Sequence, residues 1–146
     1  MVALDQLSKW LIMANFVPGA HRQIIAGFFN LTHVTNTGAA FSFLAGPAGG
    51  WRQVFFVSVS VVALAAIGWA MFTYRRQGVL FLLGLAGIGG GAAGNLIDRL
   101  RFGAVVDFLD FYVGRYHWPA FNVADSAITV GVGLFLLASL LQPDDK

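Results

Sequence analysis

Two aspartates stand where an ordinary solvated acid is not expected. Asp107 lies among large apolar residues in VVDF (residues 105–108), and Asp125 stands near the start of a long apolar segment, three residues after Asn122. Two carboxylates that meet at the mouth of a helix bundle cannot both ionise cheaply, so one of them keeps a proton. The ionised carboxylate can then activate water while the protonated one donates to a substrate carbonyl. The pair therefore predicts the chemistry of an aspartic protease.

A structural interpretation of Asp125 competes with this one. Asn122 is a good helix N-cap, and Asp125 would then occupy the third helical position, where a carboxylate complements free backbone N–H groups and the helix dipole. Taken alone, the segment 122–125 favours this capping role about two to one over a catalytic one. The presence of Asp107 on the same expected side of the membrane is what raises the catalytic hypothesis.

A second set of polar residues follows a stripe of glycines. Gly87, Gly91, Asn95 and Arg99 are spaced by four and so fall along one slowly drifting face of a helix. The glycines favour close helix packing, with Asn95 as an interhelical hydrogen bond and Asp98 with Arg99 as an ion pair at the membrane edge. For Asn95 and Arg99 this structural interpretation and a role in the site are equally weighted.

Other chemistry finds little support in the chain. Asp5 and Lys9 are four apart in the acid-first order of a helical ion pair, which indicates a buried structural pair. The three histidines lack metal-ligand spacing, cysteine is absent, and neither a serine-nucleophile motif nor a phosphate-binding glycine loop occurs. We therefore expect no metal and no cofactor.

The composition predicts the elements that must position these residues. The chain has 146 residues, of which 58% are apolar and 11% are charged, and its mean hydropathy is +0.73. Soluble domains have about 45–50% apolar and about 25% charged residues, so the bilayer is the expected solvent. Residues 53–74, 77–97 and 123–141 are apolar and long enough to span it, while 1–17 is marginally short.

These spans predict one membrane-embedded domain, residues 1–146, built as an all-α bundle of four transmembrane helices. Residues 18–50 mix β-branched and aromatic with polar side chains, which indicates a small sheet at the membrane surface. The aromatic-rich segment 99–118 is expected to form an interfacial helix or loop. A cleavable signal peptide is not expected, and a net charge of +2 with scattered cations argues against nucleic-acid binding.

Charge counting leaves the orientation open. The side with the two long connections would carry more arginines than the opposite side, which by the positive-inside rule places those connections in the cytoplasm. Several of these arginines, however, stand beside Asp98, Asp107 and Asp110 and can serve structural or site roles, so the count is a weak guide.

Five ordered blocks, spread over nearly the whole chain, carry a family resemblance. They are DQLSK (5–9), NTGAAF (36–41), GNLIDR (94–99), VVDF (105–108) and FNVADS (121–126). Together they resemble lipoprotein signal peptidase (signal peptidase II), the bacterial membrane aspartic peptidase that cleaves diacylglyceryl-modified prolipoproteins before the lipid-modified cysteine. Only four residues precede Asp5, fewer than is usual in the family, so the first helix is expected to be shortened.

The resemblance implies a role for each matching residue. Asp107 and Asp125 would be the catalytic dyad. The residues that line the site and hold the dyad or the substrate would be Asn36, Asn95, Arg99 and Asn122. Asp5 and Lys9 would be structural, and Gly91, which belongs to the glycine stripe, is expected to be structural as well.

The resemblance also implies a location and partners. It places the protein in the bacterial cytoplasmic (inner) membrane, with both termini cytoplasmic and the sheet and active site at the extracytoplasmic face. The expected partners are prolipoprotein substrates, membrane lipids and the cyclic peptide inhibitor globomycin, and we expect a monomer.

Two other functions remain open on the residues alone. A small ion-coupled carrier would use Asp107 and Asp125 as proton sites, although it leaves the Asn36-Thr37-Gly38 loop unexplained. In a non-catalytic scaffold the glycine stripe would drive helix association and the acids would be caps. Asp-to-Asn changes would alter flux in a carrier, do little in a scaffold, and abolish turnover but not binding in a protease.

Overall fold

The helices form a bundle that is most closely packed around α3. A computed structural model describes residues 1–38, 44, 46 and 50–141. The four helices among them are α1 (Val2–Asn15), α2 (Gly50–Thr73), α3 (Val79–Phe102) and α4 (Val123–Leu141). Three of these, α2, α3 and α4, are long and apolar enough to cross a membrane. The fourth, α1, is shorter, so the predicted bundle with a shortened first helix is confirmed.

Glycines set the distance between α3 and α4. A Cβ added at Gly87 would come within 3.1 Å of the Ala127 carbonyl oxygen, and one at Gly91 would collide with the Ala124 carbonyl oxygen. On the facing helix, a Cβ at Gly131 would approach the Gly84 carbonyl oxygen to 2.7 Å. The predicted use of the glycine stripe for close helix packing is therefore confirmed, and it brings the first turn of α4 directly against α3.

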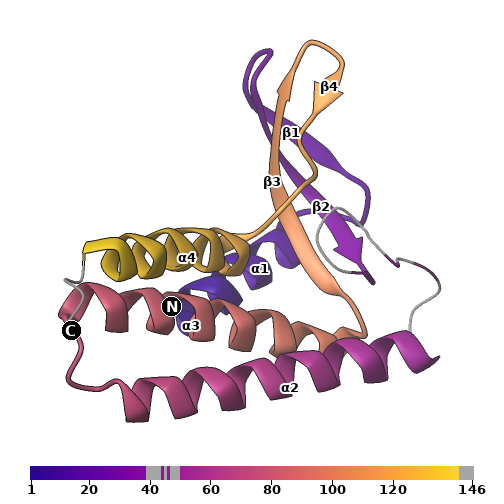
Figure 1. Cartoon of the computed structure of the whole chain (residues 1–146). Coiled ribbons are helices and arrows are strands. Elements are labelled where there is room, and N and C mark those ends of the chain that lie inside the picture. Colours follow the sequence, from indigo (N-terminus) through magenta and orange to yellow (C-terminus); the bar gives the residue numbers. More distant parts are fainter. Residues whose placement is uncertain (39–43, 45, 47–49, 142–146) are drawn as a thin grey trace.

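A four-stranded antiparallel sheet extends from one end of the helices (Figure 1). Its order is β1 (His21–Ile25), β2 (Phe29–Asn36), β3 (Val105–Val113) and β4 (Tyr116–His117). The strands predicted between residues 18 and 50 are thus present as β1 and β2. The α2–α3 connection lies at the opposite end of the bundle from the sheet (Figure 1).

The segment 99–118 differs from the expected interfacial helix or loop. Its first residues extend α3 to Phe102, and Gly103, in the left-handed conformation at φ 70°, ends the helix. The rest forms the β3–β4 hairpin. The aromatic and β-branched residues that suggested an interfacial element are also strong strand formers, and pairing with β2 selects the strand.

A small apolar core fixes the sheet to α1. Ile12 of α1 packs with Val106 and Phe108 of β3, and all three are buried. Val106 and Phe108 flank Asp107 in the sequence, so this contact holds the aspartate at the junction of the sheet and the helices. The end of α3, the first turn of α4 and the start of β3 meet at this junction.

Candidate active site

Asp125 is built into the first turn of α4. Asn122 precedes the helix, and its side-chain Oδ1 accepts a hydrogen bond of 2.9 Å from the backbone N–H of Asp125. In return the Asn122 backbone N–H donates to Asp125 Oδ2 at 3.2 Å. This is a reciprocal capping box, so the predicted N-cap and third-position carboxylate are confirmed. The Asp125 side chain is fixed by the same bonds that begin the helix.

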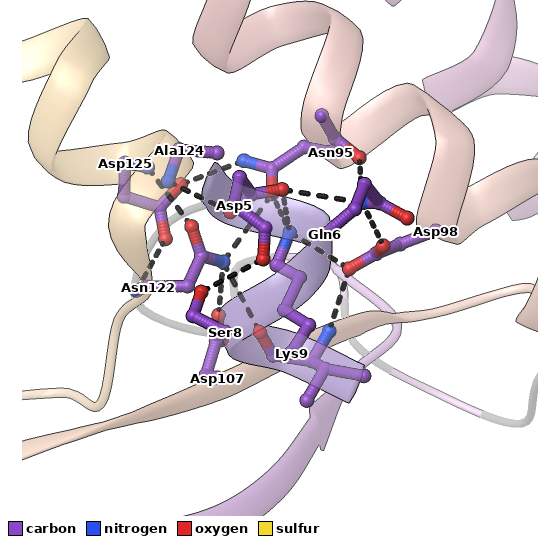
Figure 2. A network of polar contacts seen from close by, with 12 residues as sticks. Asp5, Gln6, Ser8, Lys9, Asn95, Asp98, Asp107, Asn122, Ala124 and Asp125 are labelled. Atoms are coloured by element: carbon purple, nitrogen blue, oxygen red, sulfur yellow. Dashed lines mark hydrogen bonds and ion pairs between the residues drawn. The ribbon is translucent and has the colours of Figure 1, made fainter. Parts of the chain in front are cut away.

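Asp107 approaches the same asparagine from β3. Asn122 Nδ2 donates to Asp107 Oδ1 at 2.7 Å, and both residues are buried. Asn122 therefore binds both candidate catalytic carboxylates, one through its side chain and the other through its backbone (Figure 2). Two aspartates that are 18 positions apart in the sequence are joined by one residue.

Asn95 of α3 completes the contacts of Asp125. Its Nδ2 donates to Asp125 Oδ1 at 2.8 Å, while its Oδ1 accepts from Lys9 Nζ at 2.9 Å. Both oxygens of Asp125 thus accept N–H donors. The predicted interhelical hydrogen bond of Asn95 is therefore present, and one of its partners is a candidate catalytic carboxylate.

Lys9 lies at the centre of a buried charge cluster. Its Nζ is 2.9 Å from Asp5 Oδ2 and 2.8 Å from Asp98 Oδ2, and the Lys9 side chain is 1% exposed. The predicted buried Asp5–Lys9 pair is therefore confirmed. The predicted Asp98–Arg99 edge pair is wrong, because adjacent residues of a helix point in different directions and Asp98 turns inward to Lys9.

Arg99 and Asn36 lie on the side of β2 and the following loop. Arg99 donates to the Gly38 carbonyl oxygen at 3.2 Å, and its guanidinium stands 5.3 Å from the centre of the Phe56 ring. Asn36 accepts from the Gly38 N–H and also hydrogen-bonds the Asp107 side chain. The last three residues of the predicted NTGAAF block, residues 39–41, lie outside the described residues.

Burial gives Asp107 unusual acid–base behaviour. Desolvation is the largest cause and the negative charge of Asp125 the second, and together they raise the pKa of Asp107 to about 7. Hydrogen bonds from Asn122 and Asn36 act in the opposite direction but are outweighed. A carboxyl group that holds its proton near neutral pH, beside a second carboxylate, has the properties of a general acid paired with a base.

Gln6 is a member of the network that sequence reasoning missed. Its Nε2 donates to Asp98 Oδ1 at 2.8 Å, to the Gly94 carbonyl oxygen at 3.2 Å and to Asp5 Oδ2 at 3.2 Å. Gln6 stands between Asp5 and Lys9 in the DQLSK block (5–9), and membership of that block is the signal that could have found it. The other predicted site residues all fall in or beside this junction.

Comparison with known proteins agrees with this geometry. The family model described as signal peptidase (SPase) II matches residues 1–141. The chain belongs to the lipoprotein signal peptidase family. A lipoprotein signal peptidase of Cupriavidus taiwanensis is 53% identical over 140 residues, which are 96% of this chain and 78% of the relative. One from Syntrophus aciditrophicus is 46% identical over 97% of this chain and 88% of its own length.

Solved structures support the same assignment. A bacterial membrane enzyme determined by the in meso method at 2.3 Å resolution superposes with a TM-score of 0.87 and 32% identity. The match covers 99% of this chain and 85% of that one. A second structure of this description, at 1.9 Å, has a TM-score of 0.83 over 97% of this chain and 88% of that one.

Membership of the signal peptidase II family decides among the functions that the residues left open. The protein is a bacterial membrane aspartic peptidase that removes signal peptides from prolipoproteins. The carrier and the scaffold are therefore set aside. Among the described residues, no group of three or more His, Asp or Glu side chains is arranged to hold a metal ion.

Proposed function

We propose that Asp107 and Asp125 are the catalytic dyad of this signal peptidase. The observation that carries the proposal is the position of Asn122, whose hydrogen bonds reach a carboxylate oxygen of each aspartate. Asn95, Arg99 and Asn36 support the dyad or contact the substrate, while Asp5, Lys9 and Gly91 hold the helices that carry it.

The chemistry follows from two carboxyl groups in different protonation states. The ionised carboxylate takes a proton from water as the water oxygen bonds to the scissile carbonyl carbon, and the protonated group donates to the carbonyl oxygen. Collapse of the tetrahedral intermediate breaks the C–N bond, and the leaving nitrogen receives a proton. The raised pKa of Asp107, about 7, favours it as the group that starts protonated.

The substrate class is a prolipoprotein whose cysteine carries a diacylglyceryl group, cleaved on the N-terminal side of that cysteine. Asp107 follows the end of α3 and Asp125 opens α4, so the dyad stands at one end of the membrane-length helices. This depth suits a scissile bond next to a lipid anchor, whose acyl chains remain in the bilayer. Globomycin, a cyclic peptide, is the expected inhibitor, and the whole chain acts as a single monomeric domain.

The test is cleavage of a diacylglyceryl-modified prolipoprotein peptide by purified protein, beside Asp107→Asn and Asp125→Asn. Both variants should lose turnover while globomycin still raises their thermal stability. Asp110→Asn is the matched control, because Asp110 lies on the same strand but bonds Asn30 and His117 instead. Turnover that survives in either dyad variant would reject the dyad, and loss in the control would show that the effect is not specific to it.

The same family implies that both termini are cytoplasmic and that the sheet lies outside. The chain contains no cysteine, so single cysteines can report its orientation. Arg115→Cys in the β3–β4 turn should react with an impermeant maleimide in intact cells, and Arg76→Cys should react only after lysis. Both positions are exposed. The reverse labelling pattern would invert the proposed topology.

A further inference from the structure

Lys9 uses its whole donor capacity on three buried acceptors. These are Asp5 Oδ2, Asp98 Oδ2 and Asn95 Oδ1, at 2.9, 2.8 and 2.9 Å from Nζ. An ammonium group can donate three hydrogen bonds and cannot accept any. Its bonding is therefore complete, and it has no capacity left for water or substrate.

Each acceptor of Lys9 holds a part of the structure next to a dyad aspartate. Asp5 Oδ1 accepts the backbone N–H of Ala124 at 2.9 Å, beside Asp125. Asp98 Oδ2 accepts the backbone N–H of Val106 at 3.1 Å, beside Asp107. A single carboxylate, Asp5 or Asp98, therefore connects Lys9 to the backbone N–H next to each dyad aspartate.

The third acceptor connects Lys9 to a side chain of the dyad. An asparagine amide has an oxygen end and an NH₂ end, and a hydrogen-bond donor can face only the oxygen. Because Lys9 donates to Asn95 Oδ1, the NH₂ end of Asn95 must point the other way, and there it donates to Asp125 Oδ1 at 2.8 Å. A flipped Asn95 would place its oxygen against Asp125 and its NH₂ against the ammonium.

We propose that Lys9 is a positioning residue for catalysis: it fixes the amide of Asn95 so that Asn95 donates to Asp125 and keeps it the ionised member of the dyad. The inference rests on the proposed dyad and goes beyond the structural part given to Lys9 above. The second oxygen of Asp125 accepts the Asn122 N–H, so both of its oxygens face donors, as an ionised carboxylate requires.

The charges around the dyad come from three elements besides β3. Lys9 of α1 and Arg99 of α3 act on Asp107 as positive charges, and Asp125 of α4 acts as a negative one. Asp5 and Asp98 face Lys9 itself. Substituting Lys9 alone would leave those two carboxylates buried without their cation, which is strongly destabilising.

The test therefore uses Lys9→Met/Asp98→Asn, which removes one positive and one negative charge together and leaves the net charge of the cluster unchanged. A hydrogen bond to a charged group that is lost from the transition state lowers kcat by about tenfold or more. We expect this loss with KM within about twofold of wild type. The acidic limb of the kcat profile, where the dyad takes up a second proton, should move to higher pH.

Two further variants separate positioning from stability. Gln6→Met removes bonds to the same carboxylates, Asp5 and Asp98, without touching Asn95. It should lower the melting temperature and leave the pH profile in place. Asn95→Ala should reproduce the kcat loss and the pH shift. Adding the double substitution Lys9→Met/Asp98→Asn to Asn95→Ala should cause no further shift in the pH profile.

The outcomes are distinguishable from failure of the dyad. Asp125→Asn is measured in parallel, and its loss of turnover supports the proposed dyad independently of Lys9. If Asp125→Asn loses turnover while Lys9→Met/Asp98→Asn keeps the wild-type kcat and pH profile, the positioning role of Lys9 is rejected and the dyad is not. The role is also rejected if Lys9→Met/Asp98→Asn lowers kcat as much in the Asn95→Ala variant as in wild type, because Lys9 would then act independently of Asn95. If Lys9→Met/Asp98→Asn does not fold, Asn95→Ala with unchanged pH limbs rejects the proposal by itself.

Discussion

Asn122 and Asp125 bind each other twice across the first turn of α4. Asn122 Oδ1 accepts the Asp125 N–H at 2.9 Å, and Asp125 Oδ2 accepts the Asn122 N–H at 3.2 Å. A helix cap normally contributes to stability only. Here the cap also holds a carboxylate in place beside Asp107, so the capping and catalytic interpretations of Asp125 are compatible.

Asn122 caps α4 through its Oδ1 and bonds Asp107 through its Nδ2. Two variants can separate these two roles. Serine and alanine have nearly the same volume, but only serine can cap the helix. We expect Asn122→Ser to be about 1 kcal/mol more stable than Asn122→Ala. Neither provides the amide N–H that reaches Asp107, so both should lose kcat by about tenfold or more.

Thermal unfolding and prolipoprotein cleavage in the same detergent measure the two effects. Equal stability of the serine and alanine variants would show that the cap contributes little to α4. Wild-type kcat in Asn122→Ser would show that the bond to Asp107 is not needed for turnover.

Gly91 of α3 packs directly against the first turn of α4. A Cβ there would collide with the Ala124 carbonyl oxygen and approach Ile128 Cγ1 to 2.7 Å. Backbone cannot give way as a flexible side chain can, so Gly91→Ala should push α4 from α3 and cost about 1–3 kcal/mol. Since Ala124 precedes Asp125, activity should fall as well.

Gly133 of α4 supplies the matched control. A Cβ at Gly133 meets nothing within 4 Å. Alanine is favoured over glycine in a helix by about 0.5–1 kcal/mol, so Gly133→Ala should be as stable as wild type or slightly more stable. Melting temperatures of the two variants provide the comparison, and a tolerated Gly91→Ala would contradict the packing argument.

The sequence predicts best where solvent and local chemistry alone determine the outcome. An uncharged apolar run must lie in the bilayer, so α4 was predicted as residues 123–141 and α2 to within three residues at its start. Asn122 and Asp125 formed a recognisable cap because the capping box is local. The Asp5–Lys9 pair followed from helical spacing for the same reason.

Long-range pairing was beyond the same reasoning. The residues of β3 are as suitable for an interfacial element as for a strand, and only the partner β2, whose paired residues lie 69 to 82 positions away, selects the strand. Asp98 has a charged neighbour in Arg99, but its partner Lys9 lies on α1. Gln6 lies in the DQLSK block, but its residue type and spacing did not indicate its role, because that role consists of contacts with Asp5 on α1 and Asp98 on a second helix.

The raised pKa of Asp107 predicts a particular dependence of stability on pH. An aspartate in the unfolded chain has a pKa of about 3.9, whereas that of Asp107 in the fold is about 7. Between these values the folded state binds the extra proton, so stability falls as pH rises through this window and levels off above it. Asp107→Asn lacks the titrating group and should not show this loss. The melting temperature of Asp107→Asn relative to wild type should therefore rise from pH 4.5 to pH 7 and stay level at pH 8.

Asp125→Asn removes the second cause of the raised pKa of Asp107, so the stability of this variant should begin to level off at a lower pH than that of wild type. A constant difference between wild type and Asp107→Asn across the range would mean that Asp107 titrates in the fold as it does in the unfolded chain, and that its burial does not hold the proton required of the acid.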